Sequence, residues 1–259
     1  MRFIDLGKII KERGKAMKAI VLAAGKGKRL QSEKFNLPKV LREANGKPLI
    51  GHVLEHIDFI EKKDTEIVVG YMKEKVMENV GSEYGYSVQD EQKGTGHAVI
   101  CAKDKFEDYD GDVLILYGDM PLIKKETYKA IVEKHQQSGA DCTLLTAVVD
   151  DPPAYGRIIR DENGKVTSII EEKDCTPEQK KITELNVGIY VFKSKLLFEG
   201  LKELKNSNAQ NEYYLTDMPM IFLSKGLSVD TYSVEKNSTE IYGVNTVEDL
   251  EFCEKELLK

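Results

Sequence analysis

The segment from Leu22 to Arg29 has the composition of a phosphate-binding turn. It directly follows an apolar run and reads Leu-Ala-Ala-Gly-Lys-Gly-Lys-Arg. Glycines let backbone N–H groups approach an anion closely, and basic side chains add positive charge for phosphates. The spacing matches neither a Walker A loop nor a dinucleotide-binding fingerprint. The segment therefore predicts an anion-binding turn, with an ordinary connection between a strand and a helix as the alternative.

A lysine on a proline-restrained segment follows this turn. Lys39 stands in Leu-Pro-Lys-Val-Leu, ten residues after Arg29, and Pro38 restricts the backbone just before it. A lysine there could reach the same phosphates as a point charge. Taken alone, the motif would be explained better by one solvated lysine among many. We predict that Lys39 joins Lys26, Lys28 and Arg29 in a local basic cluster.

Two oxygen-bearing side chains could bind a magnesium ion. Asp119 ends the apolar run over 112–119, and Asn245 directly precedes an expected helix. Ligands of open α/β sheets lie beyond the carboxyl ends of the strands, and Mg²⁺ takes one or two protein oxygens besides phosphates and waters. The alternative roles are a helix N-cap for Asp119 and a turn residue for Asn245.

An alternation of strands and helices must position these residues. From Lys18 to Asp150 short apolar runs alternate with helical stretches, which is typical of a parallel sheet covered on both faces. The expected strands are 19–24, 66–71, 86–90, 112–119 and 141–149, and the expected helices are 48–63, a segment from Lys73, 96–106 and 125–138. We predict a doubly wound, mostly parallel α/β sheet.

After Asp150 the pattern changes to a hairpin followed by mixed elements. Residues 156–172 alternate as two strands around a turn at 162–164. The elements expected next are a strand over 184–192, helices from Ser194 and over 211–226, a strand over 227–234 and a last helix from Thr246. Thr246 and Asp249 have the spacing of a capping box. Because repeats and Pro-rich linkers are absent from the sequence, we predict one continuous domain.

Composition excludes several classes of protein. The 259 residues include 38 Lys and Arg against 44 Asp and Glu, and this net charge of −6 disfavours a nucleic-acid binder. Four dispersed cysteines fit neither a zinc site nor a disulfide framework, which indicates a reducing compartment. No apolar run is long enough to span a bilayer. We predict a cytoplasmic protein without a membrane partner, preceded by an amphipathic helical appendage over residues 1–16.

Together, the turn and the Lys39 segment resemble the signature of the sugar-nucleotide pyrophosphorylases, nucleotidyltransferases that join a nucleoside triphosphate to a sugar 1-phosphate. Further motifs follow in that family's order, at 92–98 (QKGTGHA), 117–122 (YGDMPL), 155–158 (YGRI), 170–174 (IEEKD), 184–189 (ELNVGI), 212–217 (EYYLTD) and 243–245 (GVN). From about Met17 to the end, the chain resembles the uridylyltransferase domains of bacterial bifunctional enzymes that make UDP-N-acetylglucosamine, a cell-wall precursor. The resemblance implies a Rossmann-like, GT-A-like nucleotidyltransferase fold.

Roles for individual residues are also implied by the resemblance. The implied nucleotide-binding residues are Leu22, Ala23, Ala24, Gly25, Gly27, Lys39, Gln89, Gly94 and Thr95. The implied sugar-binding residues are Tyr117, Gly156, Glu171 and Asn186. Arg29 and Lys39 would be catalytic, and Asp119 and Asn245 would hold Mg²⁺. The implied division is a nucleotide-binding part over about 17–150, a sugar-binding part over about 151–245 and a C-terminal helix over 246–259.

The implied reaction is attack of N-acetylglucosamine 1-phosphate on UTP, which gives UDP-N-acetylglucosamine and pyrophosphate. The attacking phosphate is already an anion at neutral pH, so no general base is needed, and His97 is expected to pack or to cap a helix. A different sugar 1-phosphate or nucleotide remains an alternative, as does a non-catalytic regulatory subunit with the same fold. The regulatory role is disfavoured because Arg29, Lys39, Asp119 and Asn245 are all present.

Several positions depart from the family pattern. Lys28 stands where Thr is usual, the segment 32–36 is longer than usual, and Tyr242 stands where Glu often precedes Gly-Val-Asn. These departures bear on the basicity of the turn, on the position of Lys39 and on secondary contacts to a metal. Because no hexapeptide repeats appear before Lys259, we expect no left-handed β-helix carrying an acetyltransferase activity.

Overall fold

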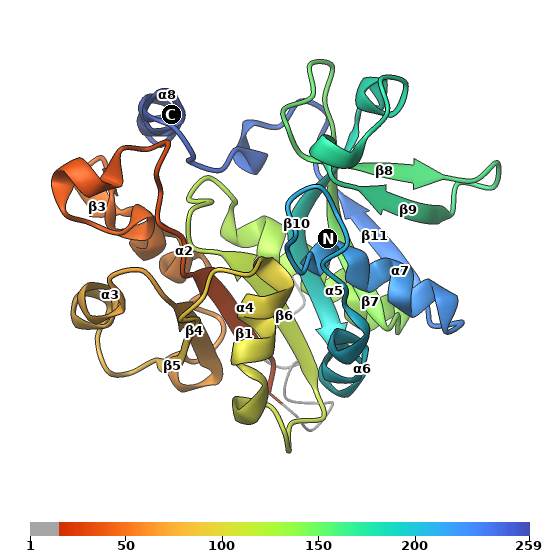
Figure 1. Ribbon diagram of the computed structural model, residues 1–259, viewed down its shortest axis with the longest axis horizontal. Helices are drawn as coiled ribbons and strands as arrows, with labels where there is room; N and C mark the ends of the chain where they lie inside the picture. The colour runs from red at the N-terminus through yellow and green to blue at the C-terminus, as the bar shows by residue number, and fades with distance from the viewer. Residues whose placement is uncertain (1–15) are drawn as a thin grey trace, which may run out of the picture.

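The computed structural model describes residues 16–259, in which one twisted sheet lies between two layers of helices (Figure 1). The helix expected over residues 1–16 falls, apart from Ala16, outside the described residues. The main strands are β1 (Lys18–Ala23), β4 (Thr65–Val69), β5 (Gly85–Val88), β6 (Asp112–Tyr117), β7 (Cys142–Val148), β10 (Glu184–Lys193) and β11 (Val229–Ser233). Their order across the sheet is β11-β7-β10-β6-β1-β4-β5.

Successive side chains of β1 explain why both faces of the sheet carry helices. Ala19 and Val21 pack into one core, whereas Ile20 and Leu22 pack into the other, because neighbouring strand residues point to opposite faces. The first face is covered by α2 (Leu49–His56), α3 (Lys73–Val80) and α5 (Lys125–Ser138), and the second by α4 (Thr95–Cys101), α6 (Ser194–Gly200) and α7 (Met218–Ser224). The predicted doubly wound, mostly parallel fold is thus confirmed.

Strand β10 runs against the direction of its neighbours. It lies between β6 and β7 and pairs antiparallel with both, whereas β1, β4, β5 and β6 pair in parallel. Its first residues also pair with β8 (Gly156–Arg160), which forms an antiparallel ribbon with β9 (Val166–Ile170). Figure 1 shows this ribbon projecting on the side of the molecule away from β4 and β5. The second half of the chain therefore supplies a central strand as well as the projecting ribbon.

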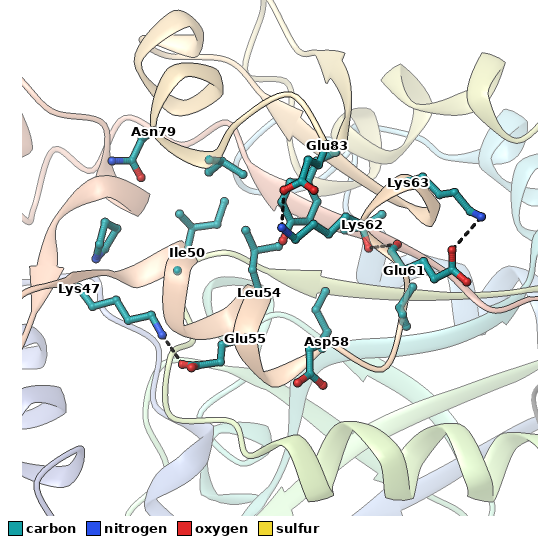
Figure 2. A pocket seen from close by; sticks show the side chains of 17 residues that line it. Lys47, Ile50, Leu54, Glu55, Asp58, Glu61, Lys62, Lys63, Asn79 and Glu83 are labelled. Atoms are coloured by element: carbon teal, nitrogen blue, oxygen red, sulfur yellow. Dashed lines mark hydrogen bonds and ion pairs between the residues drawn. The ribbon is translucent and has the colours of Figure 1, made fainter. Parts of the chain in front are cut away.

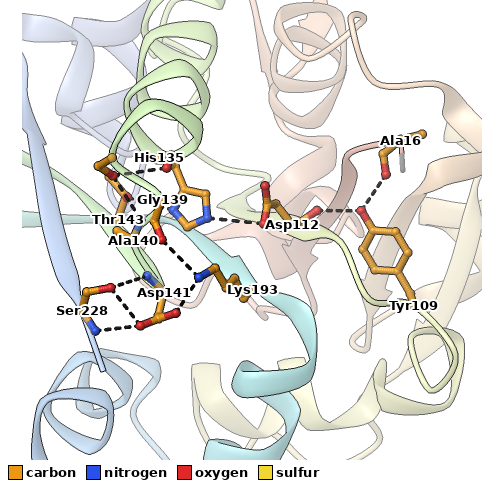
Figure 3. Close-up of polar contacts among 11 residues, drawn as sticks. Ala16, Tyr109, Asp112, His135, Gly139, Ala140, Asp141, Thr143, Lys193 and Ser228 are labelled. Carbon is orange, nitrogen blue, oxygen red and sulfur yellow. Dashed lines mark hydrogen bonds and ion pairs between the residues drawn. The ribbon is translucent and has the colours of Figure 1, made fainter. Parts of the chain in front are cut away.

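Polar contacts tie together the edge of the sheet where its parallel strands begin (Figure 3). The Asp141 carboxylate accepts hydrogen bonds from Lys193 Nζ at 2.7 Å and from the backbone N–H and hydroxyl of Ser228, both at 2.8 Å. His135 Nε2 lies 3.5 Å from Asp112 Oδ1 at the start of β6. These contacts join α5, β6, β7, β10 and the approach to β11, at the edge of the sheet opposite the carboxyl ends of the parallel strands.

The last helix, α8 (Val247–Glu256), begins with the predicted capping box. The Thr246 hydroxyl accepts from the Asp249 backbone N–H at 3.1 Å, and Asp249 Oδ2 accepts from the Thr246 backbone N–H at 2.8 Å. The helix packs beside a small second sheet formed by β2 (Glu43–Ala44) and β3 (Lys47–Pro48), as Figure 1 shows. Within residues 16–259, every helix is too short or too polar to cross a lipid bilayer.

Candidate functional site

Four side chains from distant parts of the sequence meet beyond the carboxyl ends of β1 and β6. Lys39 Nζ forms an ion pair with Asp119 Oδ2 and donates to Asn245 Oδ1 at 2.8 Å. Arg29 Nη2 donates to the same Asn245 oxygen at 3.2 Å. Lys39 and Asn245 are 206 residues apart in the sequence. The structure thus brings the two residues predicted to be catalytic against the two predicted to bind metal.

The oxygens of Asp119 and Asn245 form a donor set that suits a magnesium ion. Both already contact one cation, the Lys39 ammonium group, from two different segments of the chain. Among residues 16–259, no cluster of three or more His, Cys, Asp or Glu side chains could hold a metal. Mg²⁺ does not require such a cluster, because it binds one or two protein oxygens and completes its shell with phosphates and waters.

Gly27 lets the glycine-rich turn pack directly on the Lys39 segment. Its backbone has φ of +69°, and an added Cβ would lie 2.7 Å from Lys39 Cβ and 2.8 Å from Ser32 Oγ. A larger residue would push the two segments apart, and it would be strained at that φ. Lys39 itself begins a short 3₁₀ turn after Pro38, over Lys39–Leu41. The contact between the glycine-rich turn and the Lys39 segment brings the Arg29 and Lys39 side chains to the same atom, Asn245 Oδ1.

One pocket lies where β1 and β5 end and α4 begins. We call it the loop pocket, and its volume is about 230 Å³. Eight of the nine predicted nucleotide-binding residues line it, namely Leu22, Ala23, Ala24, Gly25, Lys39, Gln89, Gly94 and Thr95. Gly27 does not line it and instead supports Lys39 from behind.

A second pocket of about 200 Å³ lies between β6, β10 and the β8–β9 ribbon, and we call it the hairpin pocket. All four predicted sugar-binding residues line it, together with both predicted metal ligands: Tyr117, Gly156, Glu171, Asn186, Asp119 and Asn245. Gly156 and Asn186 are cross-strand partners of β8 and β10. Tyr117 and Asp119 line both pockets, so the two pockets adjoin at the end of β6.

A bulge in β10 shapes the hairpin pocket. The pairing of β10 with β7 shifts register between Asn186 and Tyr190, which re-aims the side chains there. Inside the bulge Gly188 has φ of +87°, and an added Cβ would lie 2.7 Å from the Tyr117 ring. Asn186 Nδ2 donates to the Tyr190 hydroxyl at 2.7 Å, which fixes the orientation of the amide. The bulge therefore packs Gly188 on the Tyr117 ring and fixes the Asn186 amide, both at the pocket wall.

Sequence reasoning assigned no role to two further residues of the hairpin pocket. The Thr216 hydroxyl donates to Glu171 Oε1 at 2.8 Å, while burial raises the pKa of Glu171. The Tyr155 hydroxyl donates to Ile241 O and accepts from the Gly243 N–H, both at 3.0 Å. It thereby ties the ribbon side of the pocket to the segment that carries Asn245. Thr216 stands in the motif at 212–217 and Tyr155 in the motif at 155–158. Their place in these motifs is the sequence signal that could have identified them.

Asp249 determines how Asn245 is presented. Its Oδ2 accepts from the backbone N–H groups of both Asn245 and Thr246 at 2.8 Å. We expect Asp249→Ala to lower the free energy of unfolding by about 1 kcal/mol, because two N–H groups at the start of α8 lose their acceptor. Urea denaturation would measure this. Glu248→Ala, in the same turn but exposed, is the control, and equal stability of the two variants would contradict the expectation.

A larger cleft, of about 810 Å³, lies elsewhere, beside α2 and the end of α3 (Figure 2). It shares no lining residue with the loop pocket or the hairpin pocket. As Figure 2 shows, its lysines pair with neighbouring carboxylates, Lys47 with Glu55 and Lys62 with Glu83. Pocket size alone is therefore a poor guide to the candidate site, and we base it on the convergent polar groups at the end of β6.

Comparison with known proteins agrees with this geometry. The nucleotidyl transferase family matches residues 18–234. The chain is 45% identical over 229 residues to the bifunctional protein GlmU of Clostridium novyi and 46% identical over 229 residues to that of Carboxydothermus hydrogenoformans, in each case over 88% of this chain. These matches cover 49% and 50% of the relatives, so the chain spans about half the length of the curated relatives it matches.

A solved structure shares the fold. It comes from Bacillus anthracis, is named as a glucose-1-phosphate thymidylyltransferase and was crystallised in complex with sucrose. Its TM-score to this chain is 0.72, with 24% sequence identity over 93% of this chain and 94% of that one. At this level of identity the likeness concerns the fold: a mostly parallel sheet with flanking helices.

Proposed function

Because this chain belongs to the nucleotidyl transferase family, we propose that it transfers a uridylyl group from UTP to N-acetylglucosamine 1-phosphate. The products would be UDP-N-acetylglucosamine and pyrophosphate. One observation carries the proposal: the loop pocket and the hairpin pocket adjoin at Tyr117 and Asp119. A nucleotide in the first pocket and a sugar phosphate in the second would bring their phosphates together at the end of β6.

The proposed mechanism is an in-line displacement at the α-phosphorus of UTP. A phosphate oxygen of the sugar 1-phosphate forms the new P–O bond while the bond to the leaving pyrophosphate breaks. Because the attacking oxygen is already anionic at neutral pH, no residue has to remove a proton. Catalysis then depends on positioning and on neutralising charge, as in other phosphoryl-type transfers. Arg29 and Lys39 would provide that charge from the glycine-rich side of the site.

Asp119 and Asn245 would hold Mg²⁺ in this proposal. A bound Mg²⁺ would neutralise phosphate charge in addition to the two basic side chains. The Lys39 ammonium, which now contacts both oxygens, would turn toward the triphosphate. On the sugar side, Gly156, Glu171 and Asn186 would hydrogen-bond the hydroxyl and N-acetyl groups, with Thr216 holding the Glu171 carboxylate.

A substrate panel tests the proposal. Pyrophosphate release would be measured for UTP, dTTP, CTP, ATP and GTP, each with N-acetylglucosamine, glucose and glucosamine 1-phosphates in the presence of Mg²⁺. We expect the pair of UTP and N-acetylglucosamine 1-phosphate to have the highest kcat/KM. A different best pair would identify another nucleotidyl transfer. No release with any pair would favour a non-catalytic regulatory role for the same fold.

A further inference from the structure

The side-chain amide of Gln89 is held in one orientation inside the loop pocket. Its Nε2 donates to the Gly94 carbonyl at 3.0 Å and lies 3.1 Å from His97 Nδ1. Gln89 is only 4% exposed, and its backbone N–H donates to Val69 O at 2.8 Å at the end of β4. A primary amide has two N–H groups, so these two partners use both of them.

The contact between Gln89 and His97 requires the neutral imidazole to accept at Nδ1. Since Gln89 Nε2 can only donate, the His97 proton must lie on Nε2. Burial lowers the pKa of His97, and the nearby Lys93 charge lowers it further while Glu91 opposes them. The other groups beside the ring are the Cys101 thiol, with Sγ 3.9 Å from Nδ1, and the Tyr213 ring at a centroid distance of 6.4 Å. His97 is therefore an acceptor at neutral pH.

With both N–H groups engaged, Gln89 has its carbonyl oxygen left for a ligand. Within residues 16–259, Oε1 takes part in no hydrogen bond, yet it is not among the buried side-chain atoms cut off from solvent. The residue lines the loop pocket together with Gly94 and Thr95. The pocket thus offers an acceptor where the polar edge of a base would lie.

We propose that His97 is a positioning residue that locks the Gln89 amide with its oxygen toward the base, so that the loop pocket selects uracil or thymine over cytosine. This inference rests on the proposed function for the location of the base. Uracil and thymine carry an N3–H that can donate to Oε1, whereas N3 of cytosine is a lone-pair acceptor. Two acceptors facing each other leave one polar group unpaired, and such mismatches discriminate strongly.

Removing the His97 imidazole should weaken the preference of the loop pocket for uracil or thymine over cytosine. In His97→Ala the Gly94 carbonyl alone opposes rotation of the amide, and a rotated amide would donate to N3 of cytosine. In His97→Asn the side-chain amide oxygen would accept from Gln89 Nε2 in place of Nδ1. His52→Ala removes an imidazole outside both pockets and is the matched control.

The test is isothermal titration calorimetry with UTP and with CTP, in Mg²⁺ and without any sugar phosphate. We expect the wild type and His52→Ala to bind UTP more tightly than CTP. In His97→Ala the ratio of the two Kd values should fall about tenfold, and His97→Asn should restore most of it. Thermal melts would confirm that each variant is folded.

Several outcomes would overturn the inference. An unchanged ratio in folded His97→Ala, an equal loss in His97→Asn, or a wild type that binds UTP and CTP equally or binds neither would each contradict it. Because binding is measured without turnover, failure of the proposed function looks different. Selective UTP binding without pyrophosphate release from any substrate pair would contradict the proposed uridylyl transfer. It would still support the role of His97 in orienting the Gln89 amide.

Discussion

Replacing Asp119 by Asn is expected to lower kcat for pyrophosphate release by at least about a hundredfold, the scale for a lost transition-state contact. The substitution keeps the shape of the side chain and removes its charge. That charge pairs with the Lys39 ammonium and would hold Mg²⁺ in the proposed reaction. Asp119 is also one of two residues that line both pockets, so its loss acts where the reacting phosphates would meet.

Metal binding provides a second measurement for this variant. Titration with Mn²⁺, followed by electron paramagnetic resonance, should show weaker binding to Asp119→Asn than to the wild type. Asp112→Asn is the control, because Asp112 begins the same strand, β6, at the far edge of the sheet. Near-normal turnover together with unchanged Mn²⁺ affinity in Asp119→Asn would rule out the assigned role.

Arg29→Ala is expected to lower kcat by about a hundredfold, with a smaller change in KM for UTP. Arg29 is exposed and reaches across the site to Asn245 Oδ1 at 3.2 Å. Its guanidinium would neutralise the charge that develops on the leaving pyrophosphate, an interaction that grows toward the transition state. Because the side chain is exposed, its removal should change the free energy of unfolding by less than about 0.5 kcal/mol.

Two comparisons separate this role from a general effect of charge. Arg29→Lys should recover part of the rate, since it restores the charge without the planar fork of donors. Lys34→Ala removes a positive charge from the same loop, where Lys34 pairs with Gln31 Oε1 rather than with the site. If Lys34→Ala were as slow as Arg29→Ala, the rate would depend on net charge and not on the position of Arg29.

Local sequence patterns were enough to predict most elements of the fold. Five short runs between Lys18 and Asp150 became β1, β4, β5, β6 and β7. All of them except the edge strand β5 are buried along most of their length, which is where continuous apolar segments are stable. The capping box at Thr246 and Asp249 was equally local, since it depends on contacts within one helical turn. Motifs in family order also located the residues of both pockets.

The place of β10 could not be predicted in the same way. Its residues follow the hairpin in the sequence, yet they enter the centre of the main sheet, antiparallel to β6 and β7. An apolar run shows that a strand is buried but does not show its neighbours or its direction. Those depend on where the β8–β9 ribbon ends and on which gap in the sheet is left to fill.

By itself, the sequence determined the fold class and the family and singled out the polar residues of the candidate site, because these follow from short-range patterns. Only the tertiary structure decided which of those residues touch. It placed Asn245 on Lys39 and Arg29, set Thr216 against Glu171 and oriented the Gln89 amide through His97. Contacts between residues far apart in the chain depend on how elements pack, and side-chain orientation depends on the hydrogen-bond partners that packing supplies.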